Sequence, residues 1–69
     1  MIRVVISEEH PAVLAGLAAL LQDRADVRLA GMTSSRAAAI TVVRASEPDV
    51  VVASVPARGP LAAEFARKL

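Results

Sequence analysis

Residues 49–54, DVVVAS, form a continuous apolar run that begins with an acid and ends in a serine. A run of this kind is expected for a β-strand covered on both faces, as in a parallel sheet between helices. Two other short segments have strand character: IRVVIS at residues 2–7 and VRLAGMT at residues 27–33, the latter interrupted by Arg28. The sequence therefore predicts three strands.

The segments between these strands have the spacing of amphipathic helices. In residues 11–24, Pro11 suits the first helical turn, and one face gathers the apolar side chains of Val13, Leu14, Leu17, Leu20 and Leu21. In residues 35–46 the apolar stripe is narrower and consists of Ala39, Ile40 and Val43. Ser34 or Ser35 is the expected cap of this second helix, and Pro48 stops it.

A third helix is predicted to open at Pro60, with Leu61, Phe65 and Leu69 facing inward. The order is then β-α-β-α-β-α, which favours an α/β fold with a parallel sheet and right-handed crossovers. Doubly wound, flavodoxin-like domains usually continue for two or three more strands. Residues 1–69 are therefore expected to be the first three βα units of one such domain.

Composition excludes several classes of protein. The chain has 69 residues, 55% of them hydrophobic, with no cysteine and a net charge of +1. Such a chain is not disordered, and it has neither disulfides nor thiolate zinc ligands. It lacks the basic stripe of a nucleic-acid binder, and it has no apolar run long enough for a secretory signal or a membrane span. We expect a cytoplasmic protein with no membrane contact.

The first candidate site is Glu8-Glu9-His10, directly after the first strand. Two adjacent acids can hold a hard cation such as Mg²⁺. A solvated loop whose acids favour the start of the next helix is the simpler interpretation, and we prefer it. His10 is interpreted as an ordinary residue at a helix start rather than a ligand or a base.

The second candidate is Ser54, at the carboxyl end of the third strand. A serine nucleophile needs a base and an oxyanion hole, and the G-x-S-x-G elbow is absent here. We therefore interpret Ser54 as a small polar residue that finishes the strand. The first turn, residues 7–11, has no glycine and two acids, which excludes a dinucleotide or P-loop phosphate site.

The stretches IRVVISEEHPAVLAGLAALL (residues 2–21), DRADVRLAGMTSSRAAAI (23–40) and EPDVVVAS (47–54) resemble response-regulator receiver domains. The likeness is to the NarL/FixJ (LuxR-type) class, which is joined to a C-terminal helix-turn-helix. It implies a CheY-like fold, with Glu8 and Glu9 at the acid-pair positions and Ser54 in place of the phosphoacceptor aspartate. Receiver phosphorylation requires a carboxylate nucleophile and Mg²⁺.

This chain departs from the receiver pattern at the residues that receivers use for aspartyl phosphorylation. Ser54 is not a carboxylate, two glutamates replace the usual Asp-Asp or Glu-Asp, and the loop at 55–59 keeps only Gly59 of the usual Met-Pro-Gly. The resemblance therefore implies an atypical receiver region that is not an enzyme, binds no cofactor, and binds metal weakly at best through Glu8 and Glu9. DNA binding would belong to a C-terminal domain absent from this chain.

Two functions remain open. The first is the receiver region of a two-component-type transcription regulator that works without aspartyl phosphorylation, through protein contacts. The alternative is a stand-alone or truncated protein-interaction module; a small flavodoxin-like enzyme ranks last, because no catalytic constellation is present. In the receiver strand order 2-1-3-4-5, residues 49–54 form an edge strand here. We expect that strand to pair with a second copy or with the remainder of a parent protein.

Overall fold

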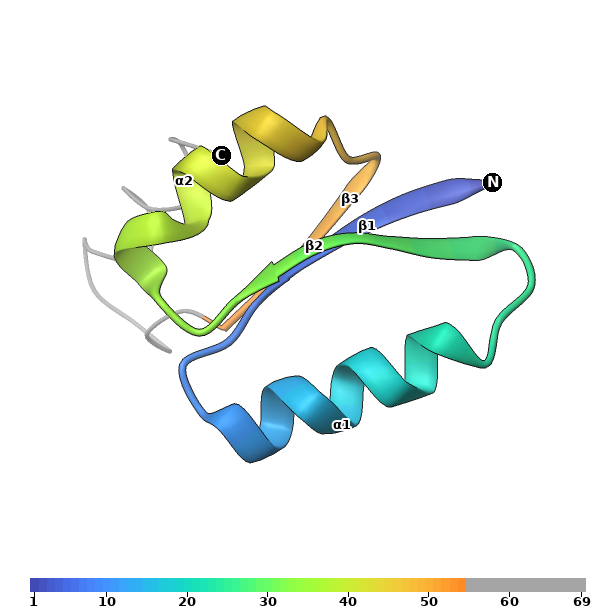
Figure 1. Cartoon of the computed structure of the whole chain (residues 1–69), viewed down its shortest axis with the longest axis horizontal. Coiled ribbons are helices and arrows are strands. Elements are labelled where there is room, and N and C mark those ends of the chain that lie inside the picture. The colour runs from blue at the N-terminus through green and yellow to red at the C-terminus, as the bar shows by residue number, and fades with distance from the viewer. Residues whose placement is uncertain (55–69) are drawn as a thin grey trace.

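The computed structural model describes residues 1–54, which form a parallel three-stranded sheet with a helix on each face (Figure 1). The elements in chain order are β1 (Ile2–Ser7), α1 (Pro11–Gln22), β2 (Val27–Thr33), α2 (Arg36–Ser46) and β3 (Val50–Ala53). The strand order is β2-β1-β3. The predicted α/β fold with a parallel sheet is confirmed, and this arrangement is consistent with part of a CheY-like domain. The helix predicted from Pro60 lies outside the described residues.

The hydrophobic core is built around β1, the central strand. Val5 and Ile6 of β1 are fully buried. On the α1 side, the cluster consists of Val4, Ile6 and Ala18, with Leu14, Leu17, Leu21, Val27 and Leu29 packed against it. On the α2 side, Ala39 is fully buried. Strand β1 is thus covered on both faces, which explains its unbroken run of β-branched residues.

Strand β2 approaches α2 closely at Gly31. A Cβ atom at this position would lie 2.9 Å from Ser46 Oγ and 3.0 Å from Val42 Cγ1, so only glycine fits without movement of its neighbours. The register with β1 also shifts here, from Val4 opposite Leu29 to Val5 opposite Gly31. The extra residue in β2 is a β-bulge, a feature that increases local twist.

The helix ends follow recognisable capping rules. Ser35 is the cap of α2, where its Oγ accepts a hydrogen bond from the Ala38 N–H at 3.3 Å. At the other end, Glu47 takes a left-handed conformation (φ 48°) directly before Pro48. These two ends agree with the predicted helix. Helix α1 ends at Gln22, two residues short of the prediction, since Asp23 is its C-cap and the Arg24 N–H bonds to the Leu21 carbonyl.

The predicted apolar face of α1 is wrong at two positions. Val13 and Leu20 are 49% and 70% exposed. Ala18, which was not on the predicted face, is buried instead. The physical reason is that α1 packs only against β1 and β2. These two strands cover one side of the helix and leave part of its apolar surface exposed.

Strand β3 is also less covered than its composition suggests. Val50 and Val52 lie opposite Val4 and Ile6, and therefore on the α1 side of the sheet, yet they are 46% and 40% exposed. The prediction of a strand covered on both faces is wrong for the described residues, because neither helix lies mainly over β3. The strand is also one residue shorter at each end than predicted.

Candidate functional site: the carboxyl edge of the sheet

The predicted site residues meet at the carboxyl edge of the sheet. The Ser54 N–H donates to the Ser7 carbonyl at 2.9 Å, and the Glu8 N–H donates to the Thr33 carbonyl at 3.0 Å. Because all strands are parallel, the ends of β1, β2 and β3 open onto one edge, where doubly wound folds place their ligands. Ser54 and Glu8 come from segments far apart in sequence and are neighbours in space.

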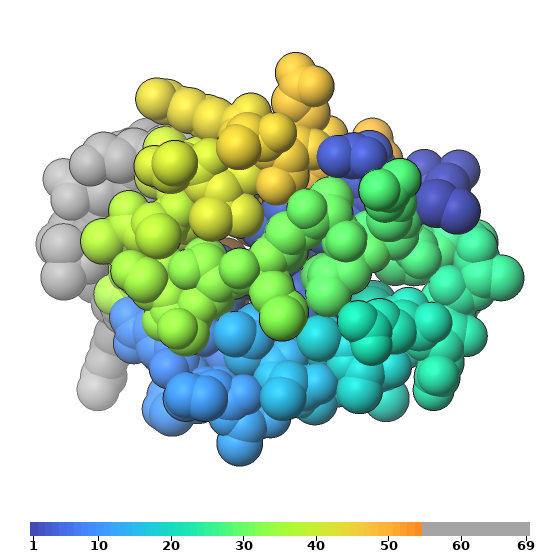
Figure 2. All heavy atoms as spheres, in the orientation of Figure 1, coloured from blue at the N-terminus to red at the C-terminus, as the bar shows by residue number. Residues whose placement is uncertain are grey.

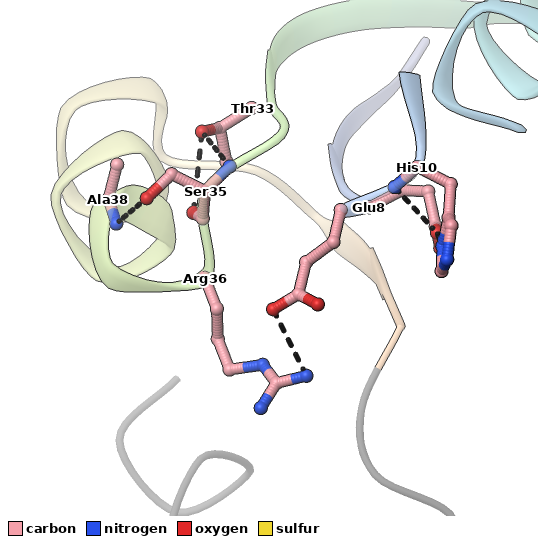
Figure 3. A network of polar contacts seen from close by, with 7 residues as sticks. Glu8, His10, Thr33, Ser35, Arg36 and Ala38 are labelled. Carbon is pink, nitrogen blue, oxygen red and sulfur yellow. Dashed lines mark hydrogen bonds and ion pairs between the residues drawn. The ribbon is translucent and has the colours of Figure 1, made fainter. Parts of the chain in front are cut away.

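Glu8 is directed toward the start of α1 (Figure 3). Its Oε1 accepts the His10 backbone N–H at 3.1 Å and lies 2.8 Å from His10 Nδ1. A carboxylate only accepts, so this pairing places the proton on Nδ1. Glu8 is 7% exposed, so the prediction of a solvated acid is wrong for this residue. Its carboxylate is held by donors of the helix start.

The pKa of Glu8 is lowered below its ordinary value. The main cause is the hydrogen bond from the His10 side chain, followed by that from the His10 backbone N–H. Desolvation acts in the opposite direction, and the Ser54 side chain adds a smaller lowering contribution. A carboxylate that holds its charge this firmly is a poor general base for the Ser54 hydroxyl.

Glu9 has a different partner from Glu8. Its Oε1 pairs with Arg36 Nη2 at 3.2 Å, and both side chains are partly exposed. Arg36 is the first residue of α2, and the Ser35 N–H before it donates to Thr33 Oγ1 at 3.0 Å. The guanidinium thus reaches from the second strand–helix turn to the first. Arg36 Nε is buried and has no hydrogen-bond partner within the described residues.

Arg36 is the residue of this candidate site that sequence reasoning missed. The available signal was a basic residue directly after the serine cap of the second helix, in a turn that parallel topology brings to the acid pair. With Arg36 in place, each acid has its own internal partner: His10 for Glu8 and Arg36 for Glu9. Within residues 1–54, no group of three or more His, Cys, Asp or Glu side chains is placed to hold a metal ion.

Ser54 is partly buried at the end of β3, beside Glu8. A nucleophilic serine needs an adjacent base, and its neighbouring carboxylate is held by His10. The loop at 55–59, with Gly59, lies outside the described residues. The site as described is a set of internally paired charges next to a hydroxyl.

Comparisons of the chain with protein-family models, with curated proteins and with solved structures found no match. Within residues 1–54, neither helix is long and apolar enough to span a membrane.

Proposed function

We propose that this chain is the atypical receiver region of a two-component-type response regulator that controls transcription, and that it works without aspartyl phosphorylation. One observation carries the proposal: the Ser54 N–H donates to the Ser7 carbonyl at the end of β1, and the Ser54 side chain lies beside Glu8, the first acid of the pair. A receiver has its phosphoacceptor carboxylate at this position. The parallel sheet, which is consistent with part of a CheY-like domain, supports the interpretation as a receiver region.

The charges at the carboxyl edge support the loss of phosphoryl transfer. Phosphoryl transfer to a receiver depends on a carboxylate nucleophile and on Mg²⁺, which offsets the charge of the incoming group. Here the nucleophile is replaced by Ser54. The remaining acids are engaged by His10 and Arg36, so a metal ion would have to displace these partners in order to bind. Both parts of the chemistry are therefore weakened together.

Regulation then proceeds through protein contacts. The DNA-binding activity belongs to a C-terminal helix-turn-helix domain outside residues 1–69, and the protein acts in the cytoplasm. The alternative is an interaction module without an attached DNA-binding domain. Val50 and Val52 of β3 are exposed within the described residues, and this apolar surface supports a contact with a partner chain or with the remainder of a parent protein. The sequence of the intact reading frame distinguishes the two.

Intact-mass spectrometry tests the central chemical point. The full chain is incubated with acetyl phosphate and Mg²⁺, alongside Ser54→Ala and a standard receiver domain as the positive control. We expect one phosphoryl adduct on the standard receiver and none on either form of this chain. A stoichiometric adduct on the wild-type chain that is lost in Ser54→Ala would contradict the proposal.

A further inference from the structure

We draw no further inference here: the strongest candidate, the uncharged outer surface of helix α1 (lower side of the molecule in Figure 2), which exposes Val13 and Leu20, carries nothing, because nothing in the structure shows what covers it.

Discussion

Replacement by alanine should have opposite effects on stability at the two glycines among residues 1–54, Gly31 and Gly16. Gly31 lies in β2 against α2, where an added Cβ meets Ser46 Oγ at 2.9 Å and Val42 Cγ1 at 3.0 Å. Gly16 lies in α1, where an added Cβ meets nothing within 4 Å. The added methyl group is therefore overpacked at position 31 and unhindered at position 16. Comparing the two variants separates the cost of overpacking from any general effect of alanine on stability.

The magnitudes follow from these surroundings. Overpacking costs about 1–3 kcal/mol, while reduced freedom of the unfolded chain returns about 0.4–1 kcal/mol. Gly31→Ala should thus destabilise the protein by roughly 1–2 kcal/mol, with rotation of the Ser46 side chain setting the lower end. Gly16→Ala removes a glycine from a helix interior and should stabilise by about 0.5–1 kcal/mol.

Urea unfolding followed by far-ultraviolet circular dichroism measures both free energies. All three proteins are compared at one concentration, so that association contributes equally. The expected midpoints rank Gly16→Ala above wild type and Gly31→Ala below it. An unchanged or raised midpoint for Gly31→Ala would refute the close approach of β2 to α2, and a lowered midpoint for Gly16→Ala would refute the open surroundings of that helix position.

Three further predictions concern single side chains. Asp49→Ala should lower the free energy of unfolding by about 0.5–1.5 kcal/mol, because the Asp49 Oδ2 accepts the Arg3 backbone N–H at 2.9 Å; the same urea assay applies, and no loss would count against that contact. Glu8 stabilises the fold at pH values above its ordinary pKa of 4.5, and this contribution is lost as pH falls through its lowered pKa. Melting curves against pH should therefore show wild type and Glu8→Gln converging in acid, and a constant gap at all pH values would contradict the His10–Glu8 pairing. Low millimolar Mg²⁺ should not raise the melting temperature of wild type, although a ligand at 100 times its Kd would add about 2.7 kcal/mol; a rise that Glu8→Gln abolishes would refute the weak-metal prediction.

The strands themselves and the helix caps are predictable from sequence because their causes are local, whereas the strand order was expected only from the resemblance to receivers. β-Branched apolar runs indicate strands, and the alternation with helical segments fixes a parallel sheet. Ser35 was one of two expected caps because its hydroxyl can accept an N–H of the first turn, and Pro48 ends the preceding helix.

The remaining features depend on contacts between distant segments. Helical spacing alone does not tell how wide a surface lies beneath α1, so Val13 and Leu20 were assigned to the core and are exposed. Glu8 is buried and has both His10 and Ser54 beside it, and Ser54 comes from a distant segment of the chain. The Glu9–Arg36 pair exists only because parallel strands bring two separate turns to one edge. None of these follows from the spacing of residues along the chain.

We propose that the carboxyl edge formed by Ser54, the acid pair and Arg36 neither binds Mg²⁺ nor is phosphorylated by phosphoryl donors. Nuclear magnetic resonance of the ¹⁵N-labelled full chain, titrated with Mg²⁺ and then with acetyl phosphate, tests this most directly. The account predicts that the amide signals of Glu8, Arg36 and Ser54 stay in place throughout both titrations. Saturable shifts at those amides that require Mg²⁺ and acetyl phosphate together would contradict it.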